Sequence, residues 1–188
     1  MKIKILLILI PFLFAFDSTK HEGLFGIKLQ SISGETFALS KLKLNKASVV
    51  VFLLPDCPAC ESYSRTLIDL REKYLKEGFE FYGVFPGNYN STEEMKTFQK
   101  TYKIPFPLLT DPDNILVHTL NAKIVPSVFL INGSGTVLYK GRIDDWLFAL
   151  GKKRAVITKH ELKDALAATS KGEPVIVKET TAIGCILE

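Results

Sequence analysis

Two cysteines separated by two residues are the part of this chain best suited to chemistry. They stand in the segment Cys57-Pro58-Ala59-Cys60, after an apolar run over residues 47–54 and before a stretch of helical periodicity. Two thiols at this spacing in the first turn of a helix can close a small, reversible disulfide. The first sulfur also lies where helix-terminal N–H groups and the helix dipole favour a thiolate. The pattern therefore predicts a site for thiol–disulfide chemistry at a strand-to-helix junction.

Length and composition fit a single folded domain around such a site. The chain has 188 residues, of which 47% are hydrophobic and 23% charged, which is enough for a sizeable core. The formal net charge is +4, and the lysines are scattered, without the basic block that follows a phosphate backbone. We therefore expect no nucleic-acid partner.

The first residues have the pattern of an export signal. Lys2 and Lys4 accompany the start of an apolar run that ends at residue 16. This run is shorter than the ~20 residues that a membrane-spanning helix needs. Residues 1–16 are expected to be a signal peptide or a short anchor that holds the protein at a membrane, and a buried N-terminal helix is the alternative. Export places the protein in the periplasm or on the outer face of the cytoplasmic membrane, where a disulfide can persist.

Apolar periodicity predicts the elements that position the two thiols. Residues 17–28 are expected to form a mobile leader. Two capping boxes, Ser91 to Glu94 and Thr158 to Glu161, are each expected to begin a helix. In chain order the sequence predicts a hairpin over 28–39, a strand over 47–54, a helix over 59–74, a strand over 79–85, a helix over 92–102, a short helix from Asp111-Pro112 to 120, a hairpin over 127–140 and a helix ending at Gly172. This order predicts an α/β fold with a mixed central sheet and helices on both faces.

This order of elements around a Cys-x-x-Cys resembles the thioredoxin superfamily. Within it the chain is similar to the redoxin branch, which includes exported thiol–disulfide oxidoreductases and peroxiredoxin-like proteins. The resemblance covers about residues 24–168 and implies a thioredoxin-like three-layer domain with an N-terminal β-hairpin over residues 17–170. Residues 171–188 remain as an extended tail. That tail resembles a narrower peroxiredoxin-like group, with Gly-Arg-Ile-Asp-Asp at 141–145 and a C-terminal Gly-Cys at 184–185.

The resemblance implies a role for each residue of the site. Cys57 is the attacking thiolate, and Cys60, one helical turn further, is the resolving thiol. Pro58 suits the first helical turn because its missing N–H is not needed there. Pro126, just before a predicted strand, matches the cis-proline that faces the two thiols, and the main chain of Val125 would then bind the partner protein. A plain turn proline is the alternative.

Asp56 departs from the aromatic residue usual before the first cysteine of thioredoxins. Its carboxylate is expected to raise the pKa of Cys57 and so to favour a reductant over an oxidant. The alternative is an exposed loop residue that caps the helix. The implied partners are protein disulfides or dithiols and an upstream thiol reductant. No organic cofactor is expected, because the dithiol itself carries the electrons.

Cys185 is a third cysteine whose role the sequence leaves open. An odd cysteine in an exported protein indicates intermolecular pairing or a reactive thiol. Cys185 could fold back on Cys57 as a second resolving thiol, join two chains, complete a metal site, or be a passive buried thiol. The oligomeric state is equally open.

Four other interpretations of the cysteines compete with thiol–disulfide exchange. Peroxiredoxins carry Pro-x-x-x-Thr/Ser-x-x-Cys, but here Leu53 and Cys57 replace the proline and the hydroxyl residue, and Pro126 stands where an arginine occurs. A thiol peroxidase would therefore rely on Cys60, or on Cys57, without its usual partners. A copper carrier would combine the cysteine pair with Cys185 or His118. The pair could also be a static disulfide or half of a zinc site, for which the chain offers few further ligands, so no metal is expected.

Overall fold

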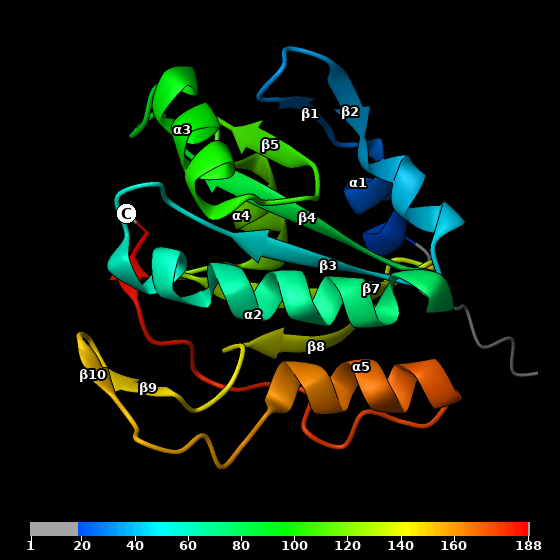
Figure 1. Ribbon diagram of the computed structural model, residues 1–188. Helices are drawn as coiled ribbons and strands as arrows, with labels where there is room; N and C mark the ends of the chain where they lie inside the picture. The colour runs from blue at the N-terminus through cyan, green and yellow to red at the C-terminus, as the bar shows by residue number, and fades with distance from the viewer. Residues whose placement is uncertain (1–18, 188) are drawn as a thin grey trace, which may run out of the picture.

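A seven-stranded mixed sheet runs through the centre of the protein, whose computed structural model describes residues 19–187 (Figure 1). The strand order is β2-β1-β5-β4-β3-β7-β8. The strands are β1 (Lys28–Ser31), β2 (Thr36–Ala38), β3 (Ala47–Phe52), β4 (Phe79–Pro86), β5 (Leu108–Asp111), β7 (Ser127–Asn132) and β8 (Val137–Gly141). The central strand β3 pairs parallel with β4 and antiparallel with β7, which makes the sheet mixed.

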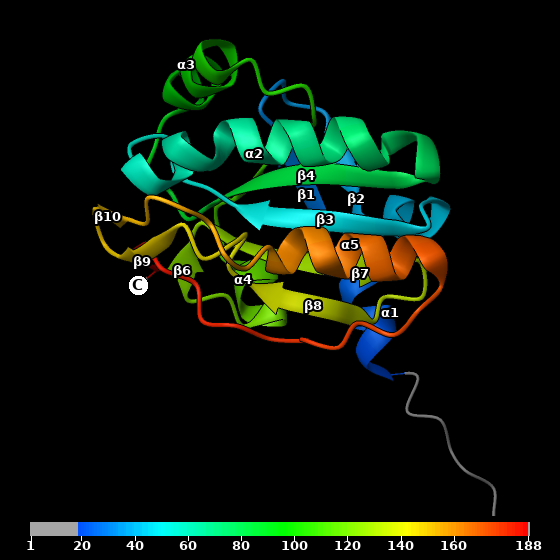
Figure 2. The ribbon, with the colours of Figure 1, turned by 60° about the horizontal axis from the view of Figure 1, so that its bottom comes forward.

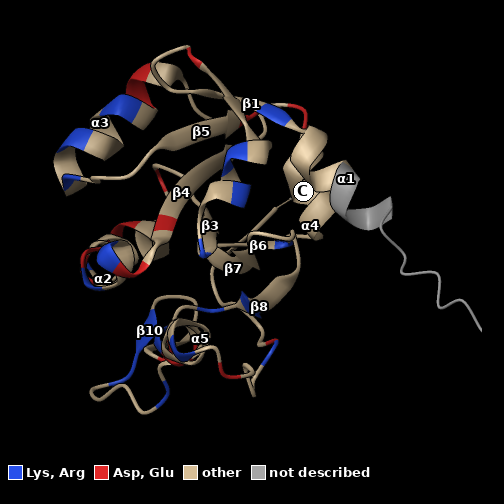
Figure 3. Cartoon of the chain, turned by 90° about the vertical axis from the view of Figure 1, so that its right-hand side faces the viewer, with Lys and Arg blue, Asp and Glu red and all other residues tan. Residues whose placement is uncertain are grey.

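Helices cover both faces of this sheet. Helices α2 (Pro58–Tyr74), α3 (Thr92–Tyr102) and α5 (Glu161–Lys171) lie on one face, and α1 (Thr19–Gly26) and α4 (Ile115–Leu120) lie on the other, as the side view shows (Figure 3). Figure 2 shows α2 lying along β4 and β3, and α5 along β7 and β8. Short 3₁₀ turns, η1 (Leu39–Leu44) and η2 (Leu75–Glu77), complete the helical part. The expected α/β architecture with helices on both faces of a mixed sheet is confirmed.

The sheet holds the thiol site at the carboxyl end of its most buried strand. Every residue of β3 is buried, because its β-branched run is covered by helices on both faces. Helix α2 buries a stripe that includes Leu67 and Tyr74, and the chain turns at Gly78, which has a positive φ of 87°. The Cys-x-x-Cys segment is thus held between two elements that are fixed by core packing.

Four very short strands lie outside the main sheet. They are β6 (Ile124–Val125), β9 (Leu147–Ala149), β10 (Lys152–Lys153) and β11 (Cys185–Ile186). Strand β9 pairs with β10, and β11 pairs antiparallel with β6. The tail leaves the end of α5, runs along β8 and ends beside β6, close to the start of α2 (Figures 1 and 2).

The structure corrects three expectations about local elements. The predicted leader over 17–28 contains helix α1, whose Leu24 is buried. The short helix begins at Ile115 instead of at Pro112, because the carboxylate of Asp111 accepts hydrogen bonds from the N–H groups of its first turn. The Thr158 capping box is absent, since α5 begins after His160.

Two further expectations concern the ends of elements and of the chain. The capping box of Ser91 and Glu94 is confirmed, with each residue bonding to the backbone N–H of the other. The predicted signal or anchor over residues 1–16 lies outside the described residues. Over residues 19–187, the structure contains no helix long and apolar enough to cross a membrane.

Candidate thiol–disulfide site

Cys57 is the residue from which helix α2 starts. It is the N-cap, with an extended backbone (φ −94°, ψ 111°), and Pro58 occupies the first helical position. Proline suits this position because its ring fixes φ near the helical value and its missing N–H would have no partner there. Cys57 is therefore positioned by the end of β3. Pro58 favours the start of α2 at this point, and Cys60 lies in the first turn of that helix.

Three sulfur atoms meet at this point of the structure. The thiol of Cys60 hydrogen-bonds to Cys57, and the Sγ of Cys185 lies 3.1 Å from the Sγ of Cys57. The backbone N–H of Leu54 points at the Sγ of Cys60 at 3.5 Å. Cys57 and Cys60 are 1% and 0% exposed, and Cys185 is half-buried. All three are free thiols. Cys57 is in contact with both of the others, so it has two thiols with which it can form a disulfide.

The environment gives the three thiols different acidities. The pKa of Cys57 is lowered to about 5, chiefly by the hydrogen bond from Cys60 and also by the hydrogen bond from Cys185, against the opposing effect of burial. Burial raises the pKa of Cys60 well above its ordinary value. Burial and the neighbouring Cys57 raise the pKa of Cys185 to about 11. At neutral pH the negative charge therefore belongs to Cys57, as a nucleophilic thiol requires.

Asp56 does not have the expected effect of raising the pKa of Cys57. It is exposed, and the N-cap of α2 is Cys57, so the carboxylate is not the capping residue. The pKa of Cys57 falls in spite of this neighbouring charge, while the charge of Asp56 contributes to the raised pKa of Cys185. The argument that Asp56 makes Cys57 a reductant therefore loses its basis.

The segment around Pro126 lies beside the thiols. The Val125–Pro126 peptide bond is cis, and the carbonyl oxygen of Val125 lies 3.8 Å from the Sγ of Cys57. Val125 belongs to β6 and is fully buried. The structure thus brings together Cys57, Cys60, Val125 and Pro126, as the resemblance implied. Their roles in binding and exchange remain proposals.

The edge formed by β6 is already paired with the tail. Strand β11 lies antiparallel to it, with Cys185 opposite Val125 and Ile186 opposite Ile124. The N–H of Leu187 donates to the carbonyl of Lys123 at 2.9 Å. Sequence reasoning missed this pairing because a strand of two residues has no periodicity to read.

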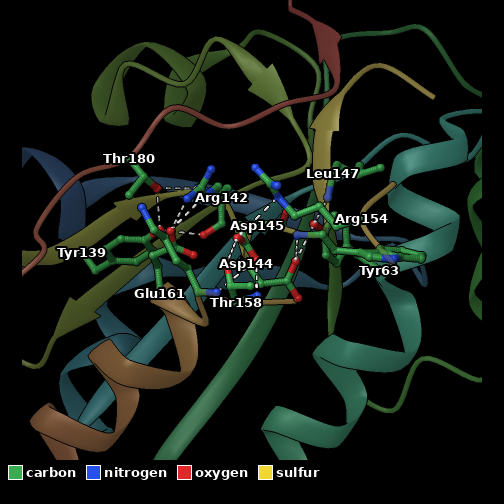
Figure 4. A network of polar contacts seen from close by, with 12 residues as sticks. Tyr63, Tyr139, Arg142, Asp144, Asp145, Leu147, Arg154, Thr158, Glu161 and Thr180 are labelled. Atoms are coloured by element: carbon green, nitrogen blue, oxygen red, sulfur yellow. Dashed lines mark hydrogen bonds and ion pairs between the residues drawn. The ribbon is translucent and has the colours of Figure 1, made fainter. Parts of the chain in front are cut away.

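A buried polar network joins α2 to the segment 141–145 and to the tail (Figure 4). Tyr63, one turn after Cys60, donates to the carboxylate of Asp144 at 2.7 Å, and burial together with this carboxylate raises the pKa of Tyr63. Asp144 also accepts the backbone N–H of Trp146 at 2.9 Å. Two features of the sequence fall in this network: the tyrosine on the buried stripe of α2, whose hydroxyl needs a partner, and the Gly-Arg-Ile-Asp-Asp segment at 141–145.

Two ion pairs lie beside this network. Arg142 forms an ion pair with Glu161 at the start of α5. Asp145 accepts bonds from Thr158 and lies 3.4 Å from Arg154, and the Thr158 hydroxyl is the main reason that the pKa of Asp145 lies well below its ordinary value. These contacts fix the segment between α2 and α5.

Three positions at which peroxiredoxins carry characteristic residues hold other residue types in this chain. Leu53, Cys57 and Pro126 occupy the positions where peroxiredoxins carry proline, a hydroxyl residue and arginine. The arginines of this chain pair with carboxylates elsewhere: they are Arg65 with Asp69, Arg71 with Glu80, Arg142 with Glu161 and Arg154 with Asp145.

The described residues also give little support to a metal centre. Among residues 19–187, no group of three or more His, Cys, Asp or Glu side chains has an arrangement suited to a metal ion. His118, the histidine considered for a copper site, is exposed in the last turn of α4.

The AhpC/TSA family model matches residues 24–140, so the chain belongs to this family. Over 86 residues it is 34% identical to a chloroplastic peroxiredoxin Q of Sedum lineare and 33% identical to that of Populus jackii. These matches cover 46% of this chain and 45% and 39% of the two relatives, so the chain spans less than half of their length.

Solved structures confirm the thioredoxin-like fold. A hypothetical protein of Sinorhizobium meliloti 1021 is 24% identical with a TM-score of 0.76, and the match covers 85% of this chain and 88% of that one. A secreted Mycobacterium tuberculosis disulfide oxidoreductase homologous to E. coli DsbE is 21% identical with a TM-score of 0.60, covering 78% and 98%. A putative thiol:disulfide interchange protein DsbE of Chlorobium tepidum is 20% identical with a TM-score of 0.58, covering 78% and 91%. The chain is therefore a redoxin, and at these identities the likeness to the three structures concerns the fold.

Proposed function

We propose that this protein is a thiol–disulfide oxidoreductase that exchanges disulfides with other proteins through Cys57 and Cys60. The observation that carries the proposal is the division of acidity between the two thiols. Cys57 has a pKa lowered to about 5, whereas Cys60, one helical turn away, stays protonated because burial raises its pKa. A thiolate nucleophile beside a protonated resolving thiol is the starting state of thiol–disulfide exchange.

The exchange conserves atoms and electrons in two displacements. The thiolate of Cys57 attacks one sulfur of a partner disulfide, and the other sulfur leaves with the electron pair. Cys60 then gives up its proton to the departing sulfur and attacks the Sγ of Cys57, which closes the Cys57–Cys60 disulfide and frees the second partner thiol. Two electrons pass from the dithiol to the partner, and an upstream thiol reductant restores the dithiol.

The low pKa of Cys57 bears on the direction of electron flow. A stabilised thiolate favours the dithiol form, which makes the pair less reducing than a pair without this stabilisation. We therefore place the couple between that of thioredoxin, at about −270 mV, and that of the strong oxidant DsbA, at about −120 mV. In that range the pair reduces a partner disulfide of higher potential, provided that a strong upstream donor keeps the dithiol reduced.

The proposal also covers the cellular location of the protein and the surface of its partners. The expected signal or anchor over 1–16 exports a domain over 17–170 with a tail over 171–188, to the periplasm or to the outer face of the cytoplasmic membrane. A hollow of about 340 Å³ beside the site is lined by Asp56, Glu61, Glu93 and Glu94 among others. A partner that docks from this side meets negative charge, which favours a basic protein surface.

A thiol peroxidase is the second candidate, since the curated relatives are peroxiredoxins Q. Against it stand the residues at the peroxiredoxin positions. A peroxidase would consume hydrogen peroxide rapidly and form a sulfenic acid on one of the two cysteines.

The test is the equilibrium of the Cys57–Cys60 pair with glutathione, measured in a Cys185→Ser variant. The proposal expects a reversible two-electron couple within the stated range and slow consumption of peroxide. A Cys60→Ser/Cys185→Ser variant is the control, because it can form only a mixed disulfide. Absence of any reversible couple would contradict the proposed function.

A further inference from the structure

The tail is fixed to the domain well before it reaches the thiols. The backbone of Lys140 in β8 bonds to the carbonyl of Lys178 and to the N–H of Thr180, both at 3.0 Å. The hydroxyl of Thr180 lies 2.7 Å from that of Tyr139 and accepts the N–H of Arg142 at 3.1 Å (Figure 4). This anchor leaves only the last residues of the chain to span the distance to β6.

Beyond the anchor, the tail pairs with β6 as an added strand. The pairing of β11 with β6 and the bond from Leu187 to Lys123 use main-chain groups, as peptides do when they bind by strand addition. Gly184 passes so close to β6 that a Cβ at this position would collide with the carbonyl of Val125 and contact the ring of Pro126. The segment is therefore seated closely on the edge where a partner protein would pair.

The seated tail also occupies the approach to the nucleophile. Cys57 is 1% exposed, and the side chain of Cys185 is one of its direct neighbours, with the two sulfurs 3.1 Å apart. A thiol on an added strand opposite Val125 is where the reacting sulfur of a docked partner would have to lie. The tail thus supplies both the docking strand and the reacting thiol of a substrate.

We propose that residues 184–187 are a tethered internal substrate, in which Cys185 exchanges disulfides with Cys57 in the same chain. This inference rests on the proposed function, because it uses the same nucleophile. In the oxidised protein the thiolate of Cys185 attacks the Sγ of Cys57 and forms the Cys57–Cys185 bond. The Cys57–Cys60 bond breaks, its electron pair goes to Cys60, and Cys60 takes up the proton that Cys185 lost. No external oxidant or reductant is consumed.

The contacts of Cys185 support exchange in the oxidised protein in particular. Two of the causes that raise the pKa of its thiol, the hydrogen bond and the charge of Cys57, are absent once Cys57 is in a disulfide. The anchor at Thr180 keeps the thiol at a high local concentration, so that the intramolecular reaction competes with partners in solution. A partner protein must therefore displace the tail before it can dock on β6.

The experiment uses a Cys60→Ser variant of the full chain treated with glutathione disulfide. Glutathione first forms a mixed disulfide with Cys57, and the proposal expects Cys185 to displace it and leave a Cys57–Cys185 disulfide within one chain. Peptide mapping under non-reducing conditions identifies the linked peptides. The matched control, Cys60→Ser/Cys185→Ser, should retain glutathione on Cys57.

A second variant separates seating of the tail from the presence of its thiol. Gly184→Ala keeps all three cysteines but places a Cβ against the carbonyl of Val125. It should lose the Cys57–Cys185 disulfide in the Cys60→Ser background and react roughly tenfold or more faster at Cys57 with a bulky maleimide in the wild-type background. Ile176→Ala, which trims a tail side chain that is 87% exposed and lies before the anchor, is the control and should behave as the parent protein.

Other outcomes of these experiments would overturn either the internal-substrate proposal alone or the proposed function as well. A stable glutathione adduct on Cys57 with Cys185 free, or a Cys185–Cys185 bond between two chains, would overturn the internal-substrate proposal and leave the proposed function standing. Failure of Cys57 to take up glutathione in both the Cys60→Ser variant and its control would overturn both. Unchanged maleimide reactivity in Gly184→Ala would show that the tail does not cover the site.

Discussion

The Sγ atoms of Cys57 and Cys185 lie 3.1 Å apart although 128 positions separate the two residues in the chain. The first stands at the junction of β3 and α2, and the second stands on a strand that the tail adds to β6. This contact turns a two-cysteine motif into a three-thiol site.

The first prediction concerns the hydrogen bond from Cys60 to Cys57. Cys60→Ala removes the largest cause of the lowered Cys57 pKa, which is about 5 in the intact site. A hydrogen bond to a charged group contributes about 1.5–3 kcal/mol, so the pKa of Cys57 should rise by about 1–2. The pH dependence of thiolate absorbance and of the iodoacetamide reaction measures this rise. Cys60→Ser, whose hydroxyl can still donate, is the control and should show a smaller change.

The second prediction concerns the pH dependence of the reduction potential. The lowered Cys57 pKa stabilises the reduced form fully above the ordinary thiol value of 9.0, and this contribution is lost as pH falls through about 5. Because Cys60 keeps its proton, reduction takes up one proton above pH 5 and two below it. The potential should therefore change by about 30 mV per pH unit above the break and by about 60 mV below it.

Glutathione equilibration of the Cys185→Ser variant checks this break, because the serine hydroxyl can still donate to Cys57. A slope of about 60 mV that continues to neutral pH would show that Cys57 is protonated there. That result would contradict the acidity assigned to the site.

The third prediction concerns the anchor of the tail. Thr180→Val removes the hydroxyl that bonds to Tyr139 and Arg142. The loss should cost about 1–2 kcal/mol and speed amide exchange in the tail. Thr181→Val is the matched control, since Thr181 is exposed. Equal amide protection of the tail in both variants would place the anchor elsewhere.

The fourth prediction concerns the bond between α2 and the segment 141–145. Tyr63→Phe leaves the buried carboxylate of Asp144 with one fewer donor, and it also removes the acceptor of the Leu147 N–H. The free energy of unfolding should fall by about 1–3 kcal/mol in urea. Asp144→Asn should lower it as well, and the double variant should cost less than the sum of the two single variants, because both act on one contact. Strict additivity would show that the two side chains are independent.

The parts of the fold with a strong local pattern were predictable from the sequence. The β-branched run of β3 and the buried stripe of α2 fixed the Cys-x-x-Cys segment at their junction, and Val125–Pro126 was expected beside it. Strand β5 was missed, because its four residues, Leu-Leu-Thr-Asp, lie between two prolines and show no alternation. Helix α1 was missed for a similar reason, since it has eight residues and only a weak apolar stripe.

The acidity of the site depended on contacts that the sequence cannot place. Asp56 is next to Cys57 in the chain and was expected to raise the pKa of Cys57, but the hydrogen bond from the thiol of Cys60 is the largest influence and lowers that pKa. The position of Cys185 depends on the anchor at Thr180 and on the close passage of Gly184 over β6. Both are long-range contacts, and neither leaves a periodic signal.

The course of the tail also matters for the behaviour of the protein at high concentration. Strand β8 is the last strand on its side of the sheet, and an unpaired edge invites pairing with another chain. The backbone N–H and carbonyl of Lys140 are already taken up by residues 178–180. The opposite edge, β2, has only three residues. The same segment that carries Cys185 to Cys57 therefore occupies the middle of the edge at which another chain would pair.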